Sequence, residues 1–240
     1  MSSFDESSVS VDIASNVQSI RLGIRQAALR AGRDPSSIQF VAATKTVAPS
    51  VLVEAYRVGV RIFGENRLQE AQEKMPNIGL RQGLAWHFIG RMQSRKLKDI
   101  VGKFSLLHSV ESVEQAHRID TAAEKLGIQQ DILLEVNVAG EGTKGGFSCK
   151  EMKEAIDQVD RLPHVAIRGL MTIPPFSDNP GGTRPYFSEL RQLRDSLAQQ
   201  RLIHGGVEEL SMGMSHDYQV AIEEGATMVR IGTALFGKRG

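Results

Sequence analysis

The chain has 240 residues, a single cysteine and a formal net charge of +1 at pH 7. Because acidic and basic residues nearly balance, no overall field draws the protein to nucleic acid or to an anionic membrane. One cysteine cannot form an internal disulfide, and the polar start MSSFDESSVS lacks the basic and apolar regions of a signal peptide. No apolar run approaches the roughly 20 residues that span a bilayer. We therefore expect a cytoplasmic protein without nucleic-acid or membrane partners.

The predicted domain organisation is a disordered extension over residues 1–10 followed by one domain over 11–240. The extension is predicted from its polar, acidic composition. The segment from Val11 to Ala31 predicts a helix that precedes the first strand. No linker, fixed repeat or shift of composition marks a second domain, and the Pro/Gly-rich stretch 173–185 is expected to be a long loop.

Beyond this helix, short β-branched or apolar runs alternate with amphipathic segments, which is typical of parallel βα units. Eight runs are predicted to be strands: 40–46, 61–66, 86–91, 105–110, 132–138, 167–173, 209–215 and 227–232. Eight strands make a (β/α)8 TIM barrel, a fold that commonly has this chain length. Only TALFGKRG follows the last strand, so the extra N-terminal helix is expected to cover the barrel where a final helix would lie.

Two of the intervening segments begin with capping-box sequences. Ser112 is followed by Gln115, and Ser148 by Glu151. In a capping box, the hydroxyl accepts a backbone N–H of the first helical turn while the Glu or Gln reaches back to the cap. Both segments are therefore predicted to start helices.

Lys45 stands near the end of the first predicted strand, in the otherwise apolar and β-branched stretch QFVAATKTV. The reactive groups of TIM barrels lie at the C-terminal ends of the strands. A buried ammonium without a partner is costly, and the usual escape is loss of its proton, which exposes a neutral amine able to form a Schiff base. The alternative, which position alone favours, is a lysine whose charged end reaches solvent. The other strand ends must decide between the two.

The last two predicted strands end in groups suited to an anion. Gly232 and Thr233 offer backbone N–H groups and a hydroxyl, and Ser211 and Ser215 lie on either side of Gly213. The loops after strands 7 and 8 are the usual phosphate site of this fold. The alternative is ordinary turn chemistry, in which Gly, Ser and Thr are common.

Arg230 lies within the last predicted strand, two residues before Gly232, so the two residues face the same side. A buried guanidinium keeps its charge and needs an acceptor, and a carboxylate such as Glu65 is an alternative partner. A strand-end lysine, a phosphate cradle and an arginine in one barrel mouth suggest pyridoxal 5′-phosphate (PLP), whose ring nitrogen contacts arginine in some enzymes. Arginine donates a hydrogen bond to an unprotonated ring nitrogen, which predicts muted carbanion chemistry.

Six motifs, in order and spacing, resemble the YggS/PROSC proteins, the pyridoxal phosphate homeostasis family: VAATKTV, FGENRLQE, WHFIGRMQSRKLK, GLMTIPP, LSMGMSHD and TMVRIGTALFG. The resemblance covers the chain from about Val11 to Lys238. It implies a single barrel like the N-terminal domain of alanine racemase, a fold type III PLP protein, in which Lys45 carries PLP as an internal aldimine and Arg230 faces the ring nitrogen. It also implies that four residues hold the cofactor phosphate: Ser211, Ser215, Gly232 and Thr233.

The same resemblance implies that Asn66 of GEN and His87 of WHFIG line the cofactor pocket. Taken alone, Asn66 is more often a helix cap before RLQEAQEK, and His87 is more often a core histidine bonded to a backbone carbonyl. The histidines of the chain are scattered, and none pairs with cysteine or a carboxylate at ligand spacing, so no metal site is predicted.

The expected function is that of a PLP buffer or carrier in intracellular PLP homeostasis, with effects on amino-acid and keto-acid metabolism. No catalytic residue is predicted, because nothing marks a tyrosine of the chain as the acid that racemisation requires. The alternatives are a PLP-dependent amino-acid racemase and a lysine aldolase without a cofactor. PLP-dependent apoenzymes are the candidate acceptors of the cofactor, and the protein is expected to be a monomer or a weak dimer.

Overall fold

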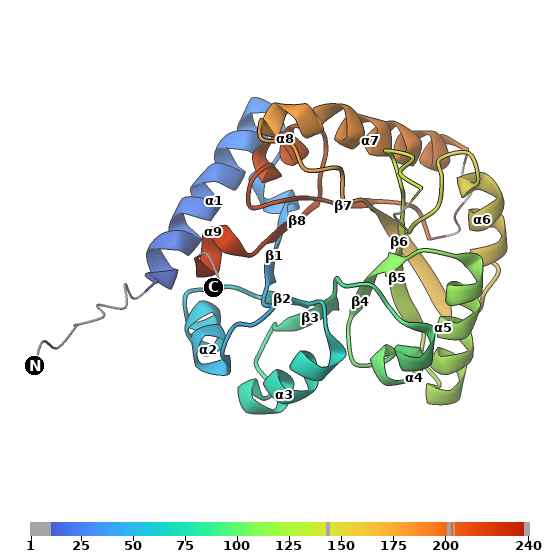
Figure 1. The fold of residues 1–240 in the computed structure, drawn as a ribbon, viewed down its shortest axis with the longest axis horizontal. Helices are drawn as coiled ribbons and strands as arrows, with labels where there is room; N and C mark the ends of the chain where they lie inside the picture. The colour runs from blue at the N-terminus through green and yellow to red at the C-terminus, as the bar shows by residue number, and fades with distance from the viewer. Residues whose placement is uncertain (1–10, 143–144, 201–202, 204, 238–240) are drawn as a thin grey trace, which may run out of the picture.

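The computed structural model of the protein describes residues 11–142, 145–200, 203 and 205–237. A closed barrel of parallel strands lies at its centre, and the strands pair in chain order until β8 returns to β1 (Figure 1). The strands are β1 (Gln39–Ala43), β2 (Ile62–Glu65), β3 (Ala85–Phe88), β4 (Leu106–Val110), β5 (Gln130–Glu135), β6 (Val165–Met171), β7 (Glu209–Met214) and β8 (Met228–Ile231). The predicted TIM barrel is confirmed, whereas the predicted extension over 1–10 lies outside the described residues.

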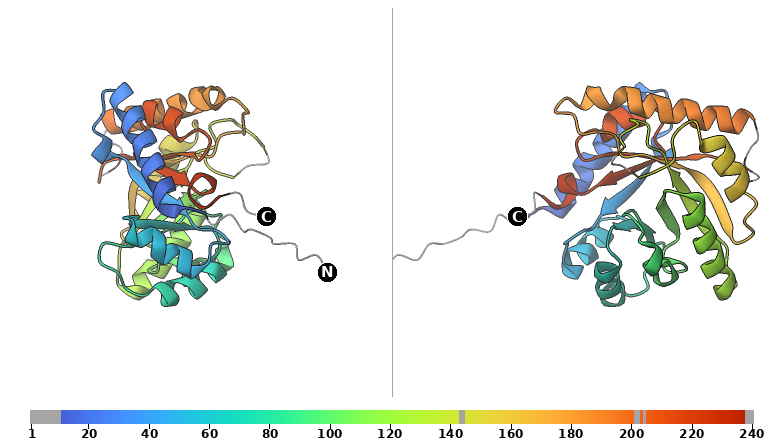
Figure 2. Two further views of the ribbon diagram at one scale, coloured as in Figure 1. Left: turned by 90° about the vertical axis from the view of Figure 1, so that its left-hand side faces the viewer. Right: turned by 45° about the vertical axis from the view of Figure 1, so that its right-hand side comes forward.

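Helices surround the barrel, as the side views in Figure 2 also show. They are α1 (Ile13–Arg30), α2 (Pro49–Arg57), α3 (Leu68–Ile78), α4 (Leu97–Ile100), α5 (Val113–Leu126), α6 (Met152–Val159), α7 (Arg184–Gln199), α8 (Tyr218–Glu223) and α9 (Thr233–Phe236). Short 3-10 turns add η1 (Pro35–Ser37), η2 (Ser94–Lys96) and η3 (Pro180–Thr183). Among these helices, none combines the length and the apolar character needed to cross a membrane.

The predicted strands are all present, but the first one ends earlier than its β-branched sequence indicates. It was expected to run to residue 46, whereas β1 ends at Ala43. The N–H of Val47 donates to the carbonyl of Thr44 (3.0 Å), which closes a turn, and Thr46 has a φ of 57° in the left-handed region. A β-branched residue rarely adopts this conformation. Lys45 therefore lies within a tight turn beyond the strand.

The helix α1 takes the place of a final barrel helix, as predicted. The carboxylate of Asp12 accepts the N–H of Ser15 (2.9 Å) at its start. Its buried residues Ile13, Val17 and Ile20 recur at the spacing of one helix face. This face packs against α8 and α9, so that the first helix of the chain lies beside its last elements (Figure 1).

Both predicted capping boxes form hydrogen bonds. The hydroxyl of Ser112 accepts the N–H of Gln115 (3.1 Å) at the start of α5. The carboxylate of Glu151 accepts the N–H of Ser148 (3.1 Å), and the hydroxyl of Ser148 accepts the N–H of Glu151 (3.3 Å). Here, however, the regular helix α6 begins only at Met152, because a turn precedes it.

The interior of the barrel is only partly apolar. Five buried side chains form one apolar cluster there: Val41, Leu106, Leu133, Met171 and Met228. Four polar side chains are also buried on the inward face of the strands: His87, His108, Ser211 and Arg230. Branched apolar residues usually fill the interior of this fold, so a group of buried polar residues needs a specific explanation.

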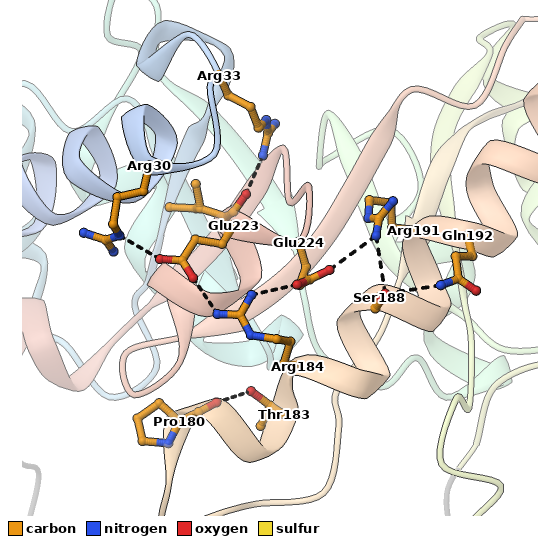
Figure 3. Close-up of polar contacts among 11 residues, drawn as sticks. Arg30, Arg33, Pro180, Thr183, Arg184, Ser188, Arg191, Gln192, Glu223 and Glu224 are labelled. Atoms are coloured by element: carbon orange, nitrogen blue, oxygen red, sulfur yellow. Dashed lines mark hydrogen bonds and ion pairs between the residues drawn. The ribbon is translucent and has the colours of Figure 1, made fainter.

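An ion-pair network joins three of the outer helices (Figure 3). Glu223 of α8 accepts from Arg30 of α1 (2.8 Å) and from Arg184 of α7 (2.5 Å). Glu224 accepts from Arg184 (2.7 Å) and Arg191 (3.4 Å). Partly exposed pairs of this kind contribute little singly, but a network fixes the position of its shared helix. The fixed helix is α8, which follows the turn that contains Ser215.

Candidate functional site

Lys45 occupies an exposed position at the end of the barrel where the strands finish. The residue before it, Thr44, is fully buried, whereas Lys45 and Thr46 are exposed. The expectation of a buried lysine within a strand is therefore wrong, because the chain turns outward after Ala43. Exposure leaves the amine accessible to a ligand.

The backbone on both sides of Lys45 is tied to α3. The ammonium of Lys74 donates to the carbonyl of Thr44 (2.7 Å), and the N–H of Thr46 donates to the carboxylate of Glu70 (2.6 Å). Lys74 and Glu70 also pair with each other (2.8 Å). The turn is therefore held at the residue before the lysine and at the residue after it, and the Lys45 side chain starts from a fixed backbone.

Glu65 completes this arrangement from β2. One of its carboxylate oxygens accepts from Lys74 (2.8 Å) and from the hydroxyl of Thr44 (2.5 Å), while the other is buried without a partner among the described residues. Burial raises the pKa of Glu65, and the hydrogen bonds from Lys74 and Thr44 oppose that shift. The alternative pairing of Glu65 with Arg230 is wrong, because Glu65 faces α3 and not the barrel interior.

Arg230 lies inside the barrel on β8 and is 4% exposed. It donates to the hydroxyl of Ser211 (2.6 Å) and to the carbonyl of Thr172 (2.9 Å). Burial lowers the pKa of Arg230 to about 10, and the charges of Glu135 and Asp217 oppose the shift, so the guanidinium stays charged at neutral pH. A guanidinium has five N–H donors, and the remaining donors can serve a ligand.

Ser211 lies apart from the other three residues that were predicted to hold phosphate. Its side chain is fully buried, and its hydroxyl contacts both Arg230 and Nδ1 of His108 (2.9 Å). Two protein groups therefore occupy this hydroxyl. We assign Ser211 to the support of Arg230 and not to a phosphate.

Ser215, Gly232 and Thr233 are brought together where β7 and β8 end. The hydroxyl of Ser215 accepts the N–H of Gly232 (3.1 Å) and the N–H of Ala234 (3.2 Å). Thr233 is exposed beside them. Backbone N–H groups and hydroxyls that converge on one point form the chemistry of an oxyanion site.

The register of β1 and β8 brings this group next to Lys45. Val41 pairs with Arg230, and Ala42 pairs with Ile231. The residues after β8 therefore lie level with the end of β1, immediately before the Lys45 turn. The amine, the guanidinium and the N–H cluster thus belong to adjacent strand ends.

Asn66 follows β2 at the same end of the barrel. It does not cap α3, whose N-cap is Arg67, so the helix-cap alternative is wrong. Its Oδ1 is buried without a hydrogen-bond partner among the described residues. Leaving a buried acceptor unpaired is costly, so this oxygen calls for a donor from a ligand or from water.

His87 lies away from the strand-end cluster. It is 5% exposed, and its Nδ1 lies 3.0 Å from Nε2 of His108, so its partner is a histidine and not a backbone carbonyl. It lines a cavity of about 530 Å³ where the strands begin, beside Gln39, Asp131 and Glu209. The expectation that it lines the pocket that contains Lys45 finds no support in this position.

Sequence reasoning did not single out Lys74, Glu70, His108 or Thr172. Lys74 lies on an amphipathic helix where a lysine ordinarily faces solvent, and Thr172 acts through its carbonyl. The one available signal was His108, a lone polar ring within the apolar run SLLHSV.

The described residues match the functional groups of PLP. The cofactor has an aldehyde, a ring nitrogen, a ring hydroxyl and a phosphate. The chain offers the Lys45 amine, unused donors of Arg230, the unpaired oxygen of Asn66 and the hydroxyls of Ser215 and Thr233. The unpaired Asn66 oxygen is the clearest sign that a ligand completes this end of the barrel. No cluster of metal-ligating side chains occurs in the described part of the chain.

Comparisons with known proteins agree with this architecture. The family model of the alanine racemase N-terminal domain matches residues 14–240. The pyridoxal phosphate homeostasis protein of Aquifex aeolicus is 49% identical over 216 residues, which cover 90% of this chain and 93% of that protein. The corresponding protein of Synechocystis is 41% identical over 205 residues, which cover 85% of this chain and 93% of the relative.

Solved structures give the same result. The structure of PipY from Synechococcus elongatus with PLP bound has a TM-score of 0.82 and 35% identity, and the alignment covers 94% of this chain and all of that one. Alanine racemase from Clostridium difficile is 17% identical with a TM-score of 0.71 over 56% of its own chain, which shows a shared fold alone. The chain belongs to the alanine racemase N-terminal domain family and, within it, to the pyridoxal phosphate homeostasis proteins.

Proposed function

We propose that this protein binds PLP covalently through Lys45 and acts in intracellular PLP homeostasis as a buffer or carrier, without substantial catalysis of its own. Its relatives bear the name of pyridoxal phosphate homeostasis protein, and PipY has been solved with PLP bound. PLP-dependent apoenzymes are the acceptors to which it would deliver the cofactor.

The observation that carries the proposal is a buried, charged arginine with unused donors beside an exposed lysine. Arg230 donates hydrogen bonds to the Ser211 hydroxyl and the Thr172 carbonyl. Its strand, β8, pairs with β1, the strand that ends before Lys45. A structural arginine would use its donors on protein acceptors. Arg230 uses donors on only two acceptors among the described residues, Ser211 and Thr172, so its other donors are available to a ligand.

Each residue has a distinct role in this proposal. The Lys45 amine binds the aldehyde, Asn66 accepts from the ring hydroxyl, and Ser215, Gly232 and Thr233 bind the phosphate. Arg230 keeps its own proton because its pKa of about 10 lies well above neutral pH, so it donates a hydrogen bond to the ring nitrogen without protonating it. PLP supplies electron withdrawal from an attached amine, and an unprotonated ring nitrogen weakens this effect.

The position of Tyr218 supports a carrier over a racemase. Racemisation needs acid and base groups on both faces of the substrate carbon. The hydroxyl of Tyr218 points toward α1, where a Cβ added to Gly23 would lie 2.1 Å from it. Packing against α1 keeps this tyrosine from acting as an acid beside Lys45.

The first experiment is to incubate the protein with PLP, reduce it with borohydride and map the modified peptide. We expect a yellow protein whose label falls on Lys45 and is lost in Lys45→Ala. Lys125→Ala, a change in an exposed lysine of α5, should leave labelling unchanged. A protein that stays colourless and unlabelled would contradict the binding proposal, and rapid exchange of an amino acid's α-proton would favour the racemase.

A further inference from the structure

A chain of four hydrogen-bonded polar side chains crosses the interior of the barrel. Arg230 donates to the hydroxyl of Ser211 (2.6 Å), which lies 2.9 Å from Nδ1 of His108. Nε2 of His108 lies 3.0 Å from Nδ1 of His87. All four side chains are buried, so each proton in the chain needs an acceptor, either in the protein or in a cavity that the chain reaches.

The arginine at one end sets the direction of the whole chain. A guanidinium has no acceptor, so Ser211 must accept from Arg230. The remaining neighbour of the Ser211 hydroxyl, within the described residues, is Nδ1 of His108. The Ser211 proton therefore goes to Nδ1 of His108, which must be unprotonated.

The same reasoning continues through both rings. A neutral imidazole with a bare Nδ1 carries its proton on Nε2, so His108 donates to Nδ1 of His87. His87 then also carries its proton on Nε2. Burial lowers the pKa of both histidines, that of His87 to about 4, which keeps the rings neutral.

The last donor of the chain, Nε2 of His87, has no protein partner in the described part of the molecule. His87 lines the cavity of about 530 Å³ at the strand starts, together with the potential acceptors Gln39, Asp131 and Glu209. A polar cavity of this size holds water that can accept the N–H. If His108 instead donated to Ser211, the Ser211 hydroxyl would accept from both of its neighbours, and its own buried proton would have no acceptor.

We infer that His108 is a positioning residue for Arg230, because it takes the Ser211 proton and so leaves only lone pairs facing the guanidinium. Ser211 and the Thr172 carbonyl then hold Arg230 in one orientation, with its other donors available to the ring nitrogen of PLP. This inference rests on the proposed function. It adds that the interior of the barrel, and not only its mouth, determines how the cofactor ring is bound.

The first test reads the protons directly and needs no cofactor. In the 15N-histidine-labelled protein without PLP, a two-bond 1H–15N correlation spectrum distinguishes the two tautomers of each ring. We expect His87 and His108 to carry the proton on Nε2 at neutral pH, with assignments from the signals lost in His87→Asn and His108→Asn. A proton on Nδ1 of His108 would overturn the inference, whether or not the protein binds PLP.

The second test separates hydrogen bonding from packing. Asparagine and leucine are close in size, and an asparagine oxygen at position 108 can occupy the place of Nδ1 and accept from Ser211. We expect His108→Leu to weaken PLP binding about tenfold, and His108→Asn to retain affinity within about threefold of the wild type. Equal losses of PLP affinity in the two variants would show that His108 acts through packing and not through its hydrogen bond to Ser211. Absence of PLP binding in the wild type would contradict the proposed function. The tautomers of His87 and His108 would still show the direction of the hydrogen bonds between Arg230 and His87.

Discussion

At the scale of single residues, Gly213 shows how a backbone requirement shapes the site. It has a φ of 88°, and a Cβ at this position would lie 2.5 Å from the Cβ of Ala221. The residue lies between Ser211, which supports Arg230, and Ser215, which gathers N–H groups. Only glycine allows β7 to bend here with α8 packed directly against it.

We predict that Gly213→Ala lowers the free energy of unfolding by several kcal/mol, because strain and a steric clash add. Gly32 is a matched control, since it also has a positive φ (66°) but no atom within 4 Å of an added Cβ. Gly32→Ala should cost only about 1–2 kcal/mol, which is the price of the left-handed conformation. Urea denaturation measures both values. Equal losses of unfolding free energy in the two variants would show that α8 shifts to accommodate the added Cβ without a further loss of stability.

At the scale of elements, the turn after β1 depends on its attachment to α3. Lys74 is 5% exposed and bonds to the Thr44 carbonyl, Glu65 and Glu70. Removing one partner of a buried ion pair leaves an uncompensated charge, whereas removing both is often tolerated.

Lys74→Met should therefore lower the free energy of unfolding by about 3–5 kcal/mol, and the double variant Lys74→Met with Glu65→Leu should recover part of the loss. The single change should also slow the reaction of PLP with Lys45, because the turn loses a bond next to the lysine. Denaturation curves and the rate of colour formation report these effects separately. Unchanged stability in Lys74→Met would show that the buried pair contributes nothing.

At the scale of the whole molecule, the buried histidines make stability depend on pH. Burial lowers the pKa of His87 from 6.5 to about 4 and that of His108 well below 6.5. Between about pH 4 and 6.5 the unfolded chain binds more protons, so the free energy of unfolding falls as the pH falls. Glu65, whose pKa is raised, acts in the opposite direction, because its contribution is complete below 4.5 and is lost as the pH rises.

Between pH 7 and pH 5 we expect a loss of about 2 kcal/mol from His87 alone. His87→Asn should make the decline shallower, because asparagine binds no proton in this pH range. Its side-chain oxygen can still accept from His108, so the hydrogen bond between the two positions is kept. His117→Asn, a change in an exposed histidine, should leave the slope as in the wild type. Urea titrations at several pH values provide the measurement, and a slope that His87→Asn leaves unchanged would disprove the contribution.

The barrel was predictable from the sequence because its evidence is local. Alternating apolar and amphipathic segments predicted all eight strands, and α1 followed from its periodicity. Parallel strands place their C-terminal ends together, so the proximity of Lys45, Arg230 and Gly232 followed once the fold was known.

The partners of the site residues could not be predicted in this way. The bonds of Arg230 to Thr172 and of His108 to Ser211 join positions 58 and 103 residues apart. Which inward-facing side chains meet depends on the stagger of the closed barrel, and a one-residue slip in register would separate them. For the same reason, the turn that exposes Lys45 depends on Lys74 and Glu70 of a separate helix.

The sequence by itself determined the fold, the end of the barrel that holds the candidate site and the residue types available there, because these properties depend on local periodicity and motif order. Only the tertiary structure decided that Lys45 is exposed, that Ser211 supports Arg230 and that two histidines connect this support to the opposite end of the barrel. Burial and hydrogen-bond partners arise from the closure of the sheet, which brings distant segments together and then requires every buried donor to find an acceptor.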